Sequence, residues 1–166
     1  MRNVEIKPVS KMNLTIEDLS YGGVSLSLIL GKDSILLHFT YVPNDPLHEL
    51  LESALGITIG IDSDIILYHA GPVNYLSVTK LDTNLCRMEF GKISGDTITI
   101  WTRRPILCYD VPIKAYCLAV LRMFDKYVYT FSMDEYKKHW RGFPKCRIER
   151  LRTKYHELKG VGVDTY

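Results

Sequence analysis

Apolar and polar side chains alternate with period two through most of the first 105 residues, which is typical of strands with one buried face. Three such runs cover residues 12–16, 24–30 and 35–41, and glycine-containing turns at 21–23 and 31–33 separate them. Connections this short cannot form parallel crossovers. The pattern therefore predicts an antiparallel meander over about residues 11–41.

Helical spacing first appears between residues 45 and 56. Asp45 can accept a hydrogen bond from the free amides of a first turn, Pro46 suits the first helical position, and Gly56 suits the position just past the end. An apolar stripe is formed by Leu47, Leu50, Leu51, Ala54 and Leu55. We therefore expect a helix over 45–56, inserted after the third strand.

Four further alternating runs lie in the middle of the chain and are separated by turn residues. They predict strands over 64–70, 73–81, 85–90 and 97–103. The strand region as a whole therefore ends at about residue 103.

The period changes after Pro105. Asp110 is placed to cap a helix with Pro112 in its first turn, and apolar residues then recur at spacings of three and four as far as Phe131. A shorter helix or turn over 132–141 and a last helix over 145–159 complete the helical region, which spans about 111–159.

Strands followed by helices predict the α+β class. The expected fold is one domain over residues 1–166, with an antiparallel sheet of about six to seven strands and two to three C-terminal helices packed on one face. The length of 166 residues and the hydrophobic content of 46% suit a single domain with a sizeable core. No secretory signal and no apolar run near the roughly 18 residues of a membrane span is present, so we expect a soluble cytoplasmic protein with no membrane partner.

Catalytic and metal-binding motifs are sparse in this sequence. The segment His48-Glu49-Leu50-Leu51-Glu52 differs at its last position from the zinc-binding HExxH pattern, and we interpret it as the solvated face of the helix start. The four cysteines are too far apart for a CxxC pair and are expected to be reduced thiols, although a nucleophilic role for Cys86 or Cys108 with a distant histidine stays open. No G-x-S-x-G, P-loop or G-x-G-x-x-G motif occurs. The sequence therefore predicts a protein that is not an enzyme and that needs no cofactor or metal.

Charge is distributed unevenly along the chain. Residues 137–166 carry a formal charge of +6, whereas residues 1–136 carry −4. The candidate partner-binding residues are therefore the cations Lys137, Lys138, Arg141, Arg147, Arg150 and Lys154, together with the aromatic residues Trp140 and Phe143. The cations either bind phosphates or form a solvated helix face, and the second interpretation is favoured. Trp140 and Phe143 either anchor a partner or staple the last helix to the sheet, and the staple is favoured.

Three stretches of the chain resemble a family of small, mostly uncharacterised bacterial proteins: "YVPNDPLHELLESAL", "GPVNYLSVTK" and "LAVLRMFDKY...YKKHWRGFPKCRIERLRTKYHEL". Tyr41, Asp45, Pro46 and Leu47 match the family's helix start. This chain has His69-Ala70-Gly71-Pro72 where that family usually has Glu-Pro-Gly, so no role of that glutamate carries over. Such families are similar in size and organisation to the immunity proteins of bacterial polymorphic toxin systems.

The resemblance implies a non-catalytic protein that binds and blocks a partner enzyme. The function expected from the sequence is therefore protein binding, in the form of an immunity-type inhibitor of a toxin. The alternative is nucleic-acid binding through the basic C-terminal helix, and an unrecognised enzyme comes third. Partner identity and oligomeric state stay open.

Overall fold

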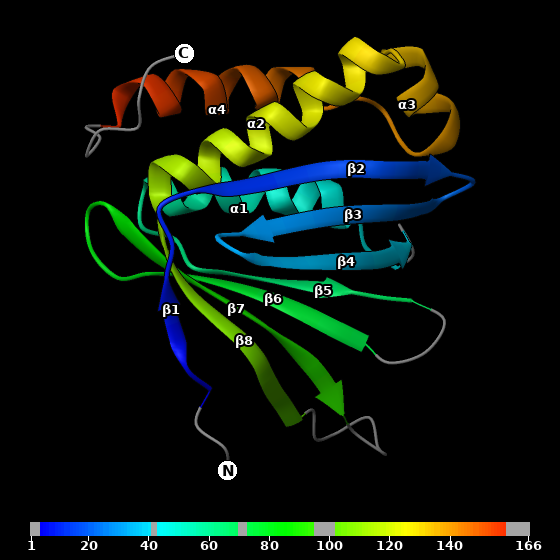
Figure 1. Cartoon of the computed structure of the whole chain (residues 1–166). Coiled ribbons are helices and arrows are strands. Elements are labelled where there is room, and N and C mark those ends of the chain that lie inside the picture. The colour runs from blue at the N-terminus through cyan, green and yellow to red at the C-terminus, as the bar shows by residue number, and fades with distance from the viewer. Residues whose placement is uncertain (1–3, 41–42, 70–72, 95–101, 159–166) are drawn as a thin grey trace.

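Eight strands and four helices make up the residues that the computed structural model describes, which are 4–40, 43–69, 73–94 and 102–158. The strands form two sheets; the last three helices lie on one side of both, and the first helix lies between the second helix, the fourth helix and the larger sheet (Figure 1). The α+β class, the helix inserted after the early meander and the C-terminal helices are confirmed. The expectation of one antiparallel sheet is wrong, because the strands divide into sheets of five and three.

The smaller sheet is the predicted meander, with strands β2 (Met12–Ser20), β3 (Gly23–Leu30) and β4 (Asp33–Thr40) in antiparallel order. Its apolar positions share the inner face, where Leu14, Leu28 and Ile35 are cross-strand neighbours. The β2–β3 turn places Tyr21 at φ 48° and Gly22 at φ 81°, the left-handed pair that matches the twist of a tight hairpin. Position 41, predicted to continue β4, lies outside the described residues.

The larger sheet has the order β1-β8-β7-β6-β5. Its strands are β1 (Ile6–Pro8), β5 (Ser63–Leu67), β6 (Val73–Lys80), β7 (Leu85–Ser94) and β8 (Thr102–Pro112). Strand β1 was not predicted, and it pairs parallel to β8, whereas the other pairs are antiparallel. A short connection leads from β1, in the larger sheet, to β2, which is the first strand of the smaller sheet.

Strand β8 is the main departure from the prediction that the strand region ends near residue 103. Asp110 lies in this strand and forms a bidentate ion pair with Arg87 of β7, with contacts of 2.8 and 3.0 Å, so it does not cap a helix. Pro105 is tolerated because it lies beside the bulge at Phe90/Gly91 and beyond the residues of β8 that pair with β1. The predicted strand residues 70 and 97–101 and the turn at 71–72 lie outside the described residues.

Two contacts hold the sheets together at their edges. Asp33, the first residue of β4, accepts hydrogen bonds from Tyr109 Oη of β8 at 2.7 Å and from Lys7 Nζ of β1 at 3.0 Å. The Thr40 amide donates to the Tyr68 carbonyl at 2.9 Å. These donors to Asp33 lower the pKa of its carboxyl group below the ordinary value, the Tyr109 hydroxyl most strongly.

Helix α1 (Pro46–Thr58) begins as the sequence predicts and ends later. Asp45 Oδ1 accepts from the His48 amide at 3.1 Å, and Pro46 fills the first helical position. Gly56 is inside the helix, and the left-handed residue is Gly60, with φ 85°. The Ile61 amide donates to the Gly56 carbonyl and the Gly60 amide to the Ile57 carbonyl, which is a Schellman ending.

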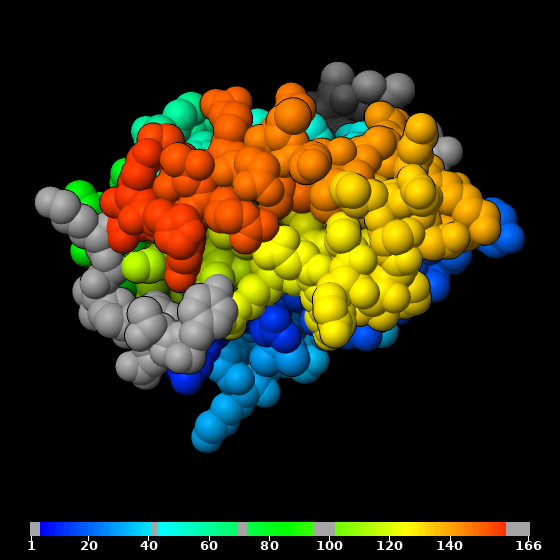
Figure 2. Space-filling model, turned by 90° about the horizontal axis from the view of Figure 1, so that it is seen from above, coloured from blue at the N-terminus to red at the C-terminus, as the bar shows by residue number. Residues whose placement is uncertain are grey.

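The remaining helices are α2 (Ile113–Thr130), α3 (Met133–His139) and α4 (Lys145–Glu157). Helix α2 packs on β2, α1 packs on β5, and α1, α2 and α4 contact one another. Figure 2 shows α4, α2 and α3 side by side when the molecule is seen from the helical side. Buried side chains from both sheets and all four helices form one hydrophobic cluster. Among the described residues, no helix combines the length and apolar character that a membrane span requires.

Candidate binding surface on the helical layer

The six predicted cations fall into two groups on the helical layer. Arg147, Arg150 and Lys154 share one side of α4, because their spacings of three and four residues match the helical turn. This side faces α1: Arg147 forms an ion pair with Glu52 of α1, and Arg150 and Lys154 line a hollow between the two helices. The structure therefore brings the basic helix against the HELLE segment.

Lys137, Lys138 and Arg141 form the second group, on α3 and just after it. Helix α3 lies at the end of the helical layer remote from the C-terminal end of α4 (Figure 1). Lys138 Nζ is 3.8 Å from Glu135 Oε1, and all three side chains are exposed.

Trp140 and Phe143 are packing residues in this structure. Trp140 is only 7% exposed, and its Nε1 donates to Asp45 Oδ1 at 2.9 Å. The same carboxylate oxygen that caps α1 therefore holds the end of α3. The Phe143 ring meets the Tyr136 ring edge-on, with centroids 5.2 Å apart, and contacts Phe124 in the same way. This geometry supports the staple interpretation, with α1 and α2 rather than the sheet as the attachment points.

Three side chains of the HELLE segment, residues 48–52, make polar contacts. Glu52 contacts both Arg147 and His48, whose Nε2 lies 3.5 Å from Glu52 Oε1. Glu49 accepts from Asn44 Nδ2 at 2.9 Å. Partial burial raises the pKa of the Glu49 carboxyl group, and the Asn44 hydrogen bond only partly opposes this. Within the part of the chain that is described, no three His, Cys, Asp or Glu side chains gather in a way that could hold a metal ion.

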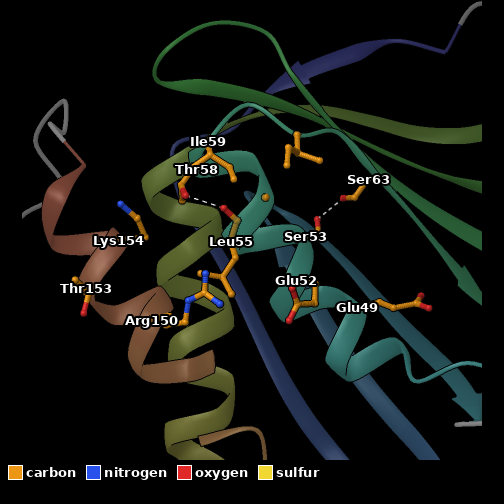
Figure 3. A pocket seen from close by; sticks show the side chains of 12 residues that line it. Glu49, Glu52, Ser53, Leu55, Thr58, Ile59, Ser63, Arg150, Thr153 and Lys154 are labelled. Carbon is orange, nitrogen blue, oxygen red and sulfur yellow. Dashed lines mark hydrogen bonds between the residues drawn. The ribbon is translucent and has the colours of Figure 1, made fainter. Parts of the chain in front are cut away.

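We define the α1–α4 groove as the hollow between the C-terminal half of α1, the turn that follows it and α4, with a volume of about 510 Å³ (Figure 3). Leu55, Ile59 and Ile61 supply its apolar surface, and Ile59 and Ile61 are 65% and 56% exposed. In Figure 3, Arg150 reaches from α4 towards α1, and Glu49 and Glu52 of α1 also line the hollow. The groove thus combines an apolar wall with a cationic rim.

Hydroxyl groups extend from the groove into the core. Ser63 Oγ donates to Ser53 Oγ at 2.5 Å, and the buried Tyr116 hydroxyl donates to the same Ser53 oxygen at 3.1 Å. Burial raises the pKa of Tyr116, so it stays a neutral donor. These contacts fix the face of α1 that borders the groove.

Most of the cysteines are core residues. Cys86, Cys108 and Cys117 are buried, and Cys146 is exposed. Burial raises the pKa of both Cys86 and Cys117 to about 12, and that of Cys108 in the same direction. A protonated thiol is a weak nucleophile, so the environments of these three residues do not activate them.

Sequence reasoning missed the groove and a serine–histidine pair. Ile59 and Ile61 were outside every predicted element, and the only available signal was two aliphatic side chains beside Gly60 in a short turn. Ser25 Oγ and His38 Nδ1 are hydrogen-bonded at 2.8 Å across β3 and β4. The two residues face each other in the register of β3 and β4, and this register could have been predicted from the short turn of the meander.

Comparison with protein-family models, with curated proteins and with solved structures finds no match for this chain. The resemblance to immunity-type proteins therefore stays a prediction.

Proposed function

We propose that this chain is a non-catalytic protein-binding domain whose contact surface is centred on the α1–α4 groove. The observation that carries the proposal is the pair of exposed isoleucines, Ile59 and Ile61, beside the Arg150 guanidinium in a surface hollow. Protein interfaces combine an apolar centre with a polar rim, and arginine is enriched in them. The groove has the same arrangement.

Charge supports docking on a partner of mixed polarity. The groove and its surroundings contain Glu52 and Arg147 as an ion pair, with Arg150 and Lys154 further along α4. Alternating signs of this kind select the partner and its orientation more than they raise affinity. The form of binding that the sequence resemblance favours is inhibition of a toxin in the bacterial cytoplasm.

Nucleic-acid binding is the second hypothesis, and the pairing of the cations argues against it. Arg147 and Lys154 contact Glu52 and Glu157, and Arg152 of the same helix contacts Asp125. A phosphate backbone would have to displace these carboxylates, and affinity for it depends on the number of cations available. The net charge of +2 is also small for a nucleic-acid-binding domain.

The test is a pull-down with the tagged full chain from lysate of its source organism, in nuclease-treated and untreated halves. The bait is compared as wild type, as Arg150→Glu and as Lys32→Glu. Lys32 is exposed in the β3–β4 turn and gives the same charge reversal away from the helical layer. We expect one protein that survives nuclease, is retained by Lys32→Glu and is lost with Arg150→Glu. Recovery of nucleic acid, with proteins lost on nuclease treatment, would contradict the proposal.

A further inference from the structure

The cationic side of the α1–α4 groove contains a guanidinium that the fold does not neutralise. Arg147, Arg152 and Lys154 of α4 all contact carboxylates of the protein itself. Arg150 has no ion pair or hydrogen bond within the described part of the chain, although it lines the groove. A guanidinium presents a planar set of donors that matches a carboxylate. Arg150 therefore offers a site for an external carboxylate, with Lys154 one turn away.

The apolar side of the groove is held in a fixed conformation. Ile59 and Ile61 flank Gly60 in the Schellman ending of α1, where the Ile61 amide donates to the Gly56 carbonyl at 2.9 Å. A Cβ atom on Gly56 would lie 3.4 Å from the Ile61 side chain, so the turn packs closely on the helix. The two isoleucines are therefore presented outward by a folded turn, and little ordering is needed before an apolar side chain can bind.

Size and charge limit what can occupy the groove. Its volume of about 510 Å³ falls within the range of about 300–1,000 Å³ for small-ligand sites, which suits a few side chains and not a helix. Glu52 also lines the groove and is ion-paired with Arg147, so a strongly anionic group would meet a like charge. One carboxylate next to an apolar group meets both conditions.

We propose that the α1–α4 groove binds a segment of a protein partner in which one Asp or Glu lies next to aliphatic side chains. The carboxylate pairs with Arg150, near Lys154, and the aliphatic side chain packs on Ile59 and Ile61. This inference rests on the proposed protein-binding function and names the chemistry that the partner supplies.

The test uses three fluorescein-labelled peptides and the full chain, with binding followed by fluorescence anisotropy. The first peptide has a single glutamate flanked by leucines, the second has glutamine in place of the glutamate, and the third has serines in place of the leucines. We expect the first peptide to bind roughly tenfold more tightly than either of the others, since each lacks one of the two contacts. Arg150→Gln should remove the difference between glutamate and glutamine, and Ile59→Ser the difference between leucine and serine.

Lys32→Gln, which neutralises an exposed cation in the β3–β4 turn away from the helical layer, is the matched control and should bind as the wild type does. Equal binding of the glutamate and glutamine peptides, no binding of any peptide, or no effect of Arg150→Gln would overturn the inference. Inorganic phosphate that competes at the same concentration as the peptide would also overturn it, because the groove would then be a general anion site. The proposed function fails separately, when the pull-down yields no nuclease-resistant partner.

Discussion

Helices α2 and α4 lie next to each other in one layer but are attached to the protein in different ways. Ten of the 18 residues of α2 are buried, whereas only Ile148 and Leu151 are buried among the 13 residues of α4. Helix α4 is tied instead by side-chain ion pairs, from Arg147 to Glu52 on α1 and from Arg152 to Asp125 on α2.

The difference separates the part of the helical layer that belongs to the core from the part that carries the proposed binding surface. Helix α2 is enclosed between β2 and the other helices, so its stability is that of the whole core. Helix α4 leaves most of its surface in water and keeps its cations at the rim of a groove. Binding surfaces commonly use elements that contribute less to the core.

The largest expected contrast is in thiol reactivity, because each helix carries one cysteine. Cys117 of α2 is 0% exposed, and burial raises its pKa to about 12, whereas Cys146 of α4 is exposed. We expect Cys146 to react with iodoacetamide at least about a thousandfold faster than Cys117 at neutral pH, since Cys117 must wait for the core to open. Mass spectrometry of tryptic peptides after timed labelling measures both rates.

The control for this measurement is Cys146→Ser, which should leave the native protein almost unlabelled. In denaturant, the remaining thiols should all react. Labelling of Cys117 at a rate close to that of Cys146 in the wild type would mean that α2 is not part of a stable core.

The next contrast is in the cost of truncating one buried side chain on each helix. Phe124 of α2 is 0% exposed, and Phe124→Ala should lower the free energy of unfolding by about 3–5 kcal/mol. Ile148 of α4 is 3% exposed, and Ile148→Ala should cost less, about 2 kcal/mol, because Leu151 is the one other buried side chain of α4. Urea denaturation followed by circular dichroism gives both values, and an equal loss for the two variants would contradict the comparison.

How well each helix could be predicted from the sequence depends on how much of it is buried. The apolar period of α2 has a long, regular signal because the helix is buried on most sides, and it identified the element correctly. The start of α2 was predicted too early because aspartate is a common helix cap. Asp110 instead pairs with Arg87, which lies on a neighbouring strand. Strand β1 was missed because its three paired residues are too few to show an alternation of apolar and polar positions.

The candidate site was predicted only where it follows from one helix. Spacing along α4 placed Arg147, Arg150 and Lys154 on one side, and the structure agrees. The partner of that side is α1, about 90 residues earlier, and a single sequence carries no signal for such a contact. Ile59 and Ile61 can be recognised as part of a groove only once α4 is known to lie opposite them.

A smaller effect concerns Glu49 on the α1 side of the groove. Its pKa is raised above the ordinary value of 4.5, chiefly by burial, so the folded protein holds this proton more tightly than the unfolded chain. Stability therefore falls as the pH rises from below 4.5 through the raised pKa, and the cost is complete above that pKa. Glu49→Gln, which can still accept from Asn44, should melt slightly higher than the wild type at pH 7.

This advantage should disappear at acid pH, where Glu49 is protonated in both states. Melting curves at a series of pH values between 3 and 7 measure it. An advantage that is the same at both ends of the series would show that ionisation of Glu49 is not its cause.

The smallest effect is expected for the ion pair that links α4 to α1. Arg147 and Glu52 are 49% and 46% exposed, and solvent screens pairs of this kind strongly. Arg147→Gln should therefore lower the free energy of unfolding by at most about 0.5 kcal/mol at low ionic strength, and the loss should vanish in 1 M salt. Local hydrogen exchange is the more sensitive measurement, because α4 is then held by two buried side chains and by the exposed pair of Arg152 with Asp125. We expect faster exchange in α4 and unchanged exchange in α2. A stability loss of about 2 kcal/mol or more that persists in high salt would mean that the pair is part of the core, and the distinction between the two helices would fail.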